Sequence, residues 1–453
     1  MEHLGALTLI PTLVVLVLAI YTKRSIEALI AGSVVGILMI SPSDPIGLLR
    51  DKSIAVLTDE DVAWVILVCG LMGSLIALLI KTGAATAFTN SLTHLIKGKR
   101  SALFVTWVLG LFLFVDDYLN SLAVGSAMRK VTDHYKTSRE MLSYVVDSTA
   151  APISVLIPIS TWAVFFGALL EDNGLAENGQ GVWVYIQSIP YMLYAWIAAI
   201  IVPLVIWGKI PLFGAMKKAE MRAEQTGVCV PPGAEHIELA NQSITEKPGV
   251  KANLWQFVLP MVALVAFTWH FDIDLLKGIY VTLALTVILI VIQRTLTAHE
   301  AFDTIIDGFK TMIEPLAVLV AAFLLKEVND GLGLTQYIIE SLQPYMTAQI
   351  LPLAIFLTMG LVSFATGSNW GVFVIILPIV AALGNSLNAD MALVIGATLS
   401  ASTFGSHACF YSDATVLTAQ ASGCTPFQHA YTQLPYALIA AAITSLGYIL
   451  LML

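Results

Sequence analysis

Two adjacent carboxylates in the middle of an apolar sequence constrain this chain more than any other feature. The stretch FVDDYLNSLAVGS, residues 114–126, places Asp116 and Asp117 directly after a hydrophobic run, and Asn120 and Ser121 follow. An ionisable group at bilayer depth costs at least about 2.5 kcal/mol, so such residues normally face a cavity, a counter-ion or another polar group. The stretch is typical of the tip of a broken or re-entrant membrane segment, where carbonyl and side-chain oxygens can surround a cation.

Composition places the rest of the chain in the membrane. Hydrophobic residues make up 58% of the sequence and charged residues only 12%, and the mean hydropathy is +0.84, values that soluble globular proteins of this size do not show. At roughly 20 residues a span, the chain has room for about ten to twelve membrane crossings. The net charge of −9 does not favour nucleic acid as a partner. The four cysteines show no metal-ligand spacing, and we expect free thiols.

The carboxylate pair lies in an apolar run, residues 101–131, that is too long for one crossing. If this run crossed the membrane once, its two basic flanks would fall on opposite sides, against the charge bias of short loops. A hairpin that enters and leaves from the cytoplasm places both flanks on one side and the polar tip near the bilayer midplane. The basic residues concerned are Lys97, Lys99, Arg100, Arg129, Lys130, Lys136 and Arg139.

A polar segment divides the chain into two similar halves. Hydropathy falls between residues 209 and 253, which we expect to be a cytoplasmic linker, and residues 217–225 (KKAEMRAEQ) are expected to form an interfacial helix. The same order of apolar runs precedes and follows this linker. The sequence predicts a first repeat at 1–208, with a hairpin at 101–131 and a broken helix at 142–170, and a second repeat at 254–453, with a hairpin at 349–384 and a broken helix at 390–418.

The linker and the number of crossings per half set the orientation of the two halves. An odd number of crossings in each half makes the halves insert in opposite senses, which is the inverted-repeat plan of secondary transporters. The distribution of Lys and Arg supports this topology. Most of them fall in predicted cytoplasmic loops, and only Arg50, Lys52 and Lys277 fall clearly on the outer side. The predicted fold is an all-α polytopic membrane protein of two inverted-topology repeats, each with about five transmembrane helices, a re-entrant helical hairpin and discontinuous helices.

Each half contains two polar breaks rich in the hard oxygen donors that Na⁺ prefers. These breaks supply the candidate ion- or substrate-binding residues. They are Asp116, Asp117, Asn120 and Ser121; Asp147, Ser148 and Thr149; Thr366, Ser368 and Asn369; and Ser406, His407, Ser412, Asp413 and Thr415. The candidate Na⁺ ligands among them are Asp116, Asp117, Asn120 and Asp147.

Each of these residue types also has a structural interpretation. A Ser or Thr in a span most often donates to the carbonyl one turn behind it. Asp147 and Asp413 can equally serve as structural hydrogen-bond acceptors, and so can the Asp116–Asp117 pair. His407 is either a proton carrier or a packed, neutral histidine. Four further acidic residues have basic neighbours and are expected to be solvated: Asp133, Glu140, Glu220 and Glu224.

Three motifs resemble those of the NhaC-type Na⁺/H⁺ antiporters of the broader ion-transporter superfamily. They are FVDDYLNSLAVGSAMRKVTDHYKTSREMLSYVVDSTAAPISVLIPISTW, ATGSNWGVFVIILPI and FGSHACFYSDATVLTAQASGC. The resemblance implies a multi-pass secondary transporter of the bacterial inner membrane, assembled as a homodimer. It places the family's functional motifs on Asp116, Asp117 and Asn120, on Asp147, Ser148 and Thr149, and on Thr366, Ser368, Asn369, His407, Ser412, Asp413 and Thr415.

The chain departs from this family pattern in its last motif. Related sequences usually carry an Asp directly after the Gly of that motif and a Ser-Pro a few positions on. Here these places hold Ser406 and then Cys409 and Phe410. A site with one carboxylate fewer and one aromatic ring more can still bind Na⁺, and it is better suited to hold something organic beside the ion.

The sequence leaves two transport functions open. The first is Na⁺/H⁺ antiport by alternating access, with Na⁺ and H⁺ competing for the same buried carboxylates. The second is Na⁺- or H⁺-coupled transport or exchange of a small organic solute, an amino acid or a carboxylate. An intramembrane enzyme is not expected, because HEAFD at 299–303 lacks the second His of a zinc motif. The expected partners are Na⁺, H⁺ and the lipid bilayer, with Na⁺ as coupling ion and no cofactor.

Overall fold

The computed structural model describes residues 4–22, 24–237, 244–250, 253–342, 347–367 and 370–451. Every regular element in these ranges is an α-helix or a short 3₁₀ helix. The prediction of an all-α polytopic membrane protein is confirmed at this level. The candidate residues Ser368 and Asn369 lie outside the described residues.

The chain up to the linker forms twelve α-helices and two 3₁₀ turns. They are η1 Gly5–Leu9, α1 Ile10–Thr22, α2 Ser25–Ile40, α3 Pro45–Thr58, α4 Glu60–Lys81, α5 Ala84–Leu95, α6 Lys99–Phe112, α7 Asp117–His134, α8 Arg139–Asp147, α9 Ala151–Ser154, α10 Thr161–Asp172, α11 Gly181–Ser188, η2 Ile189–Tyr191 and α12 Leu193–Ile206. The chain thus breaks between α6 and α7, at the predicted hairpin tip, and again on both sides of α9.

The linker and the rest of the chain are also helical. These elements are α13 Gly214–Thr226, α15 Trp255–His270, α16 Leu275–Ile292, α17 Ala298–Lys310, α18 Ile313–Leu332, α19 Leu334–Leu342, α20 Leu351–Thr366, α21 Trp370–Ser386, α22 Met391–Ala408, α23 Asp413–Ser422 and α24 Pro426–Leu451. Breaks separate α20 from α21 and α22 from α23, where the sequence predicts the second hairpin and the second broken helix.

Several of the helices are long and apolar enough to cross a bilayer. By length and composition, four stretches of the described residues qualify: Gly5–Thr22, Val62–Lys81, Leu275–Ile292 and Pro426–Leu451. The number rises to seven if each bent helix pair counts as one span, and one such pair is α22 with α23, bent by 44°. Shorter apolar helices include α2, at a predicted crossing, and α20, in the predicted second hairpin.

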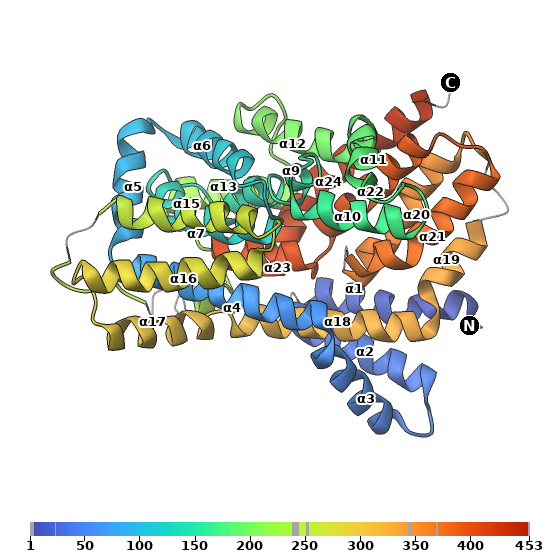
Figure 1. The fold of residues 1–453 in the computed structure, drawn as a ribbon, viewed down its shortest axis with the longest axis horizontal. Coiled ribbons are helices and arrows are strands. Elements are labelled where there is room, and N and C mark those ends of the chain that lie inside the picture. Colours follow the sequence, from blue (N-terminus) through green and yellow to red (C-terminus); the bar gives the residue numbers. More distant parts are fainter. Residues whose placement is uncertain are drawn as a thin grey trace.

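The helices pack in a pattern that relates the first half to the second. α1 packs on α2 and α15 on α16; α2 also packs on α18, and α16 packs on α4. α12 of the first half packs on α22 of the second, and α24 of the second half packs on α8 of the first. Figure 1 shows α4, α16, α17 and α18 along one long edge of the molecule and α6, α11 and α12 along the opposite edge. α7, α22, α23 and α24 lie between them, so the broken segments meet in the interior (Figure 1).

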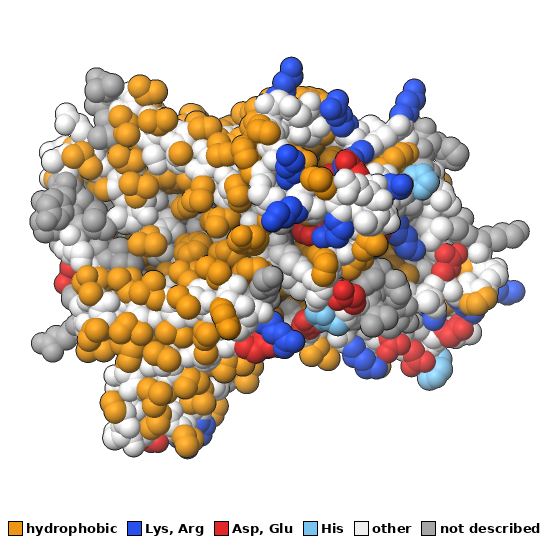
Figure 2. Space-filling view, turned by 180° about the vertical axis from the view of Figure 1, so that it is seen from behind, with side chains coloured by type: hydrophobic (Ala, Val, Ile, Leu, Met, Phe, Trp, Pro, Cys, Tyr) orange, Lys and Arg blue, Asp and Glu red, His pale blue; other side chains and the backbone are white. Residues whose placement is uncertain are grey.

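The surface is divided into an apolar part and a charged part. Figure 2 shows hydrophobic side chains covering much of one side of the visible face, whereas Lys, Arg, Asp, Glu and His side chains gather toward the other side. Large hydrophobic residues are widely exposed, for example Tyr280, Ile288 and Ile292 of α16 at 48%, 53% and 74%. A surface of this kind suits burial in lipid with one strongly charged aqueous side.

The linker helix α13 packs against protein through the residues of its apolar face. Met216, Ala219 and Ala223 are buried, and α13 contacts α8 and α24. An interfacial helix is what its sequence predicts, and the structure shows which helices cover its apolar face.

Two acidic residues, one in α8 and one in α13, correct the sequence prediction. Glu140 and Glu220, expected to be solvated, are only 3% and 2% exposed. Arg222 donates to both carboxylate oxygens of Glu140 at 3.0 and 2.8 Å, and Glu220 pairs with Lys99. Glu220 also accepts from the backbone N and Oγ of Ser138, at 2.8 and 2.7 Å. We call Lys99, Glu140, Glu220 and Arg222 the linker clamp. Its two acidic residues are buried, and its two basic residues are partly buried and pair with them.

Candidate functional site

Asp116 has a structural role at the start of α7. Its Oδ1 accepts hydrogen bonds from the backbone N of Tyr118 at 2.9 Å and of Leu119 at 3.0 Å, and its Oδ2 accepts from Oγ1 of Thr161 at 3.1 Å. It is the N-cap of the helix, where a carboxylate satisfies free N–H groups and lies at the positive end of the helix dipole. The structure thus gives different roles to the two adjacent aspartates.

Asp117 is the aspartate of the pair that does not cap the helix. It is fully buried, and neither oxygen accepts a hydrogen bond of good geometry from a described residue, although the indole of Trp162 lies close. Asn120, three residues on and therefore on the same helix face, has its Oδ1 buried and unpaired as well. Burying a carboxylate without a partner is costly, and a nearby cation or a proton on the carboxylate lowers that cost.

The amide of Asn120 is held in place from its other end. Nδ2 donates to the carbonyl of Gly110 in α6 at 2.8 Å and to that of Thr149 at 2.7 Å. A Cβ at Gly110 would lie only 2.0 Å from Oγ1 of Thr149, so this close approach of α6 to the break after α8 requires glycine. With both N–H groups engaged, Oδ1 of Asn120 is fixed as a free oxygen donor.

Asp413 brings the second half of the chain to the same place. Ser412 is the N-cap of α23, and its hydroxyl accepts from the backbone N of Thr415 at 3.3 Å. Asp413, the next residue, is buried and accepts a 2.6 Å hydrogen bond from the hydroxyl of Tyr118. Nearby, Thr418 of α23 donates to Ser121 of α7 at 2.8 Å. The N-terminal turns of α7 and α23 therefore meet side by side.

These contacts bring three carboxylates together without a basic partner. Asp117 interacts electrostatically with Asp116 and with Asp413. No Lys or Arg among the described residues forms an ion pair with any of the three. Like charges in a low-dielectric interior repel strongly, so the site favours cations and protons. We call Asp117, Asn120 and Asp413 the open-oxygen site.

A second buried cluster surrounds Asp147, which ends α8. Oδ2 of Asp147 lies 2.6 Å from Nε2 of Gln433, 3.1 Å from Nε2 of His429 and 3.9 Å from Nε2 of His407. His407 also contacts Oγ of Ser148 through Nε2 at 3.0 Å and the hydroxyl of Tyr194 through Nδ1 at 2.8 Å. Both halves contribute, since α8 and α12 precede the linker and α22 and α24 follow it. We call Asp147, His407, His429 and Gln433 the histidine cluster.

The remaining candidates have mainly structural contacts. The hydroxyls of Thr149 and Thr366 donate to carbonyls one turn behind, to Val146 and Val362 at 2.9 Å each. Thr415 donates to the carbonyl of Cys409 at 3.0 Å and so holds the break between α22 and α23. Oγ of Ser406 is buried without a partner among the described residues.

Four residues in or next to the open-oxygen site and the histidine cluster were not predicted from the sequence. They are Tyr118, Tyr194, His429 and Gln433. A signal existed for the last two, because polar residues four apart share one face of an otherwise apolar helix. Tyr118 and Tyr194 give no such signal, since a Tyr in a membrane segment is ordinary. Their roles follow only from the pairing of distant helices.

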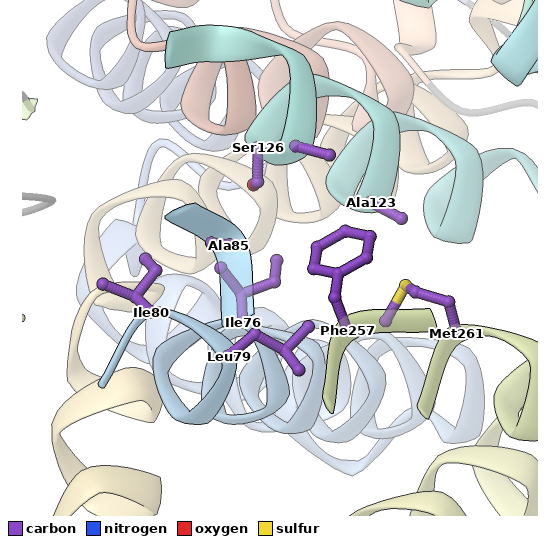
Figure 3. A pocket seen from close by; sticks show the side chains of 9 residues that line it. Ile76, Leu79, Ile80, Ala85, Ala123, Ser126, Phe257 and Met261 are labelled. Carbon is purple, nitrogen blue, oxygen red and sulfur yellow. The ribbon is translucent and has the colours of Figure 1, made fainter. Parts of the chain in front are cut away.

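Two small cavities lie beside α7 and α23. Figure 3 shows the first, with Phe257 and Met261 of α15 facing Ala123 of α7. The second shares Ser126 with it and extends to Ala421 of α23. Both are lined mostly by apolar or small side chains, and we call them together the seam.

A wider cavity opens where α2 and α24 begin. Its rim carries charged side chains, including Arg24, Glu27, His236 and Glu314. Ser25, which also lines it, donates to the carbonyl of Phe410 at 3.4 Å. Through Ser25 the cavity borders the break between α22 and α23, and its lining includes Pro232 and Gly233 of the linker.

Comparison with known proteins agrees with a transporter. An uncharacterized protein of Haemophilus influenzae (strain ATCC 51907 / DSM 11121 / KW20 / Rd) is 28% identical over 483 residues, covering 98% of this chain and 90% of that protein. The Na⁺/H⁺ antiporter family model matches residues 164–452, more than half of the chain. That range includes His407, Asp413 and His429 and begins after α7 and α8. Membership implies a secondary transporter of Na⁺ and H⁺ rather than an enzyme. The chain belongs to the Na⁺/H⁺ antiporter family.

Proposed function

We propose that this protein exchanges Na⁺ for H⁺ across the membrane, with Na⁺ bound at the open-oxygen site. One observation carries the proposal: both oxygens of Asp117 and Oδ1 of Asn120 are buried on one face of α7, and none of them accepts a hydrogen bond of good geometry from the residues that the structure describes. Oxygen donors without competing N–H groups are what a hard cation requires. Asp413 adds negative charge from the opposite half. A proton bound close to these carboxylates offsets the same negative charge, so Na⁺ and H⁺ exclude each other.

Alternating access is proposed to arise from movement along the seam. The apolar and small side chains there make few directional contacts that such movement would break, while the wider cavity beside Phe410 provides an approach from the linker side. The reciprocal packing of α2 on α18 and of α16 on α4 supports two inverted repeats, with the hairpins α6–α7 and α20–α21 in equivalent positions. An NhaC-type exchanger in the bacterial inner membrane, assembled as a homodimer, is consistent with this arrangement.

Reconstitution in liposomes tests the function. Addition of Na⁺ should dissipate an imposed pH gradient with wild-type protein and should not do so with Asp117→Asn, which keeps the size of the side chain and removes its charge. Asp51→Asn is the matched control, because the Asp51 side chain is 62% exposed and far from the polar breaks in sequence. A wild-type protein that leaves the gradient intact, at verified insertion, would contradict the proposal.

A small organic solute, an amino acid or a carboxylate, is the second candidate substrate. Ser406 supports it, because its Oγ is buried without a partner among the described residues and lies four residues before Phe410, whose ring stacks on that of Phe427. Under this alternative Ser406→Asp weakens solute uptake and strengthens Na⁺/H⁺ exchange without solute. Under pure antiport the same substitution only shifts the pH profile and the apparent Na⁺ affinity. If wild-type exchange proceeds at a rate that no amino acid or carboxylate alters, the alternative is excluded.

A further inference from the structure

The surroundings of Asp147 differ in kind from those of Asp117. Oδ2 of Asp147 already accepts from the amide of Gln433 at 2.6 Å and contacts the imidazole of His429 at 3.1 Å. Nitrogen donors aimed at a carboxylate repel a metal cation and stabilise the ionised form. Asp117 has no such donor of good geometry. Although Asp147 is a candidate Na⁺ ligand by sequence, its neighbours suit a proton better than Na⁺.

The atom at which a proton can bind is identifiable. If Nε2 of His429 carries a hydrogen and donates to Asp147, Nδ1 holds a lone pair. Nδ1 is buried and has no hydrogen-bond partner among the residues that the structure describes. Oε1 of Gln433 is likewise buried and has no partner among them. A proton can therefore bind to Nδ1 without breaking an existing hydrogen bond. The resulting imidazolium lies directly against the Asp147 carboxylate, which compensates its charge.

His407 connects the cluster to α12 and to the end of α8. Its two ring nitrogens contact hydroxyls, Tyr194 at 2.8 Å and Ser148 at 3.0 Å, and a hydroxyl can either donate or accept. Either tautomer of the neutral ring therefore satisfies both contacts. The titratable groups that face Asp147 are His429 of α24, His407 of α22 and Tyr194 of α12, with Asp413 of α23 within electrostatic range.

We propose that Asp147, His407 and His429 form the proton site of the exchanger, separate from the Na⁺ site at Asp117, Asn120 and Asp413. This inference rests on the proposed function and assigns a binding site to the proton, the second of the two exchanged ions. Two links join the sites. Asn120 donates to the carbonyl of Thr149, two residues after Asp147, at 2.7 Å, and Asp147 interacts electrostatically with Asp413. A proton on the histidine cluster makes it more positive and weakens Na⁺ binding, as exchange requires.

The two sites can be separated by measuring two kinds of exchange in the same liposomes. Radioactive Na⁺ exchanging with unlabelled Na⁺ needs the Na⁺ site alone, whereas Na⁺-driven proton movement needs both sites. His429→Gln keeps an amide N–H that can donate to Asp147 but cannot bind a proton. We expect it to retain Na⁺/Na⁺ exchange within about twofold and to lose Na⁺/H⁺ exchange by at least about tenfold. Asp117→Asn should lose both activities.

The control is His299→Gln, since the His299 side chain is 90% exposed; it should retain both activities. The proton site is wrong if His429→Gln exchanges protons like the wild type, or if it loses both exchanges equally while its thermal unfolding is unchanged. Should His429→Gln fail to fold, His407→Gln carries the same expected split. A wild-type protein without either exchange would instead refute the proposed function, and the proton site with it.

Discussion

Tyr118 donates a 2.6 Å hydrogen bond to Oδ2 of Asp413, across 295 residues of sequence. The bond joins the start of α7 to the start of α23 and fixes one carboxylate oxygen of the open-oxygen site. Both residues are buried. The finding explains how two polar breaks, one in each half of the chain, form one site.

Removing this hydroxyl tests its contribution. Tyr118→Phe leaves a buried carboxylate oxygen without its donor, which costs about 1–3 kcal/mol. We expect a lower unfolding temperature in the absence of Na⁺ and partial recovery when Na⁺ binds. Tyr185→Phe is the control, because it removes a buried hydroxyl that donates only to the carbonyl of Val155. Equal responses of both variants to Na⁺ would show that Tyr118 does not serve the ion site.

The two adjacent aspartates should respond differently to the same substitution. Asp116→Asn keeps an N-cap oxygen and should retain exchange, whereas Asp117→Asn should lose it. Asp116→Ala removes the cap and should cost about 0.5–2 kcal/mol of stability. Thermal unfolding and pH-gradient dissipation in liposomes separate the two effects. The reverse order, with Asp117→Asn active and Asp116→Asn inactive, would place the ion on Asp116.

In the linker clamp, the effects of Arg222→Gln and Glu140→Gln on stability should depend on each other. Arg222→Gln leaves Glu140 charged, buried and unpaired, which typically costs about 3–5 kcal/mol. Adding Glu140→Gln removes the stranded charge, so the double variant should be more stable than Arg222→Gln alone. Unfolding in detergent for the four proteins of this cycle measures the interaction. Strictly additive effects would mean that the two side chains do not depend on each other.

The linker cysteine should react slowly with maleimides. Burial and the neighbouring Asp133 carboxylate raise the pKa of Cys229 to about 11, and only the thiolate reacts. Labelling at pH 7 should therefore be slow, increasing about tenfold for each pH unit toward that pKa. An introduced cysteine at the exposed position Gln225 should label quickly in inside-out vesicles and not in intact cells. Rapid labelling of this variant in intact cells would contradict a cytoplasmic linker.

The breaks before α7 and α23 depend on local sequence. Apolar runs interrupted by capping residues define them locally: α7 starts after Asp116, and α23 starts after Ser412. Composition alone fixes an all-helical membrane protein. These features depend on residues close together in the chain, so one sequence contains the necessary information.

What the sequence does not predict depends on which helices pair. Glu140 and Glu220 have basic neighbours in sequence, but their burial follows from the position of α13 against α8. Likewise, the different roles of Asp116 and Asp117 depend on backbone direction at the helix start. The histidine cluster requires α24 to pack on α8, which places His429 beside Asp147.

The central claim is that Asp117 binds Na⁺, and direct binding of radioactive Na⁺ to purified protein tests it. Wild-type protein should bind Na⁺ saturably, with affinity that falls as the pH is lowered, because protons bound at the histidine cluster weaken Na⁺ binding. Asp117→Asn should show no saturable binding, while Asp51→Asn should bind like the wild type. Unchanged Na⁺ binding by a folded Asp117→Asn protein would contradict the account.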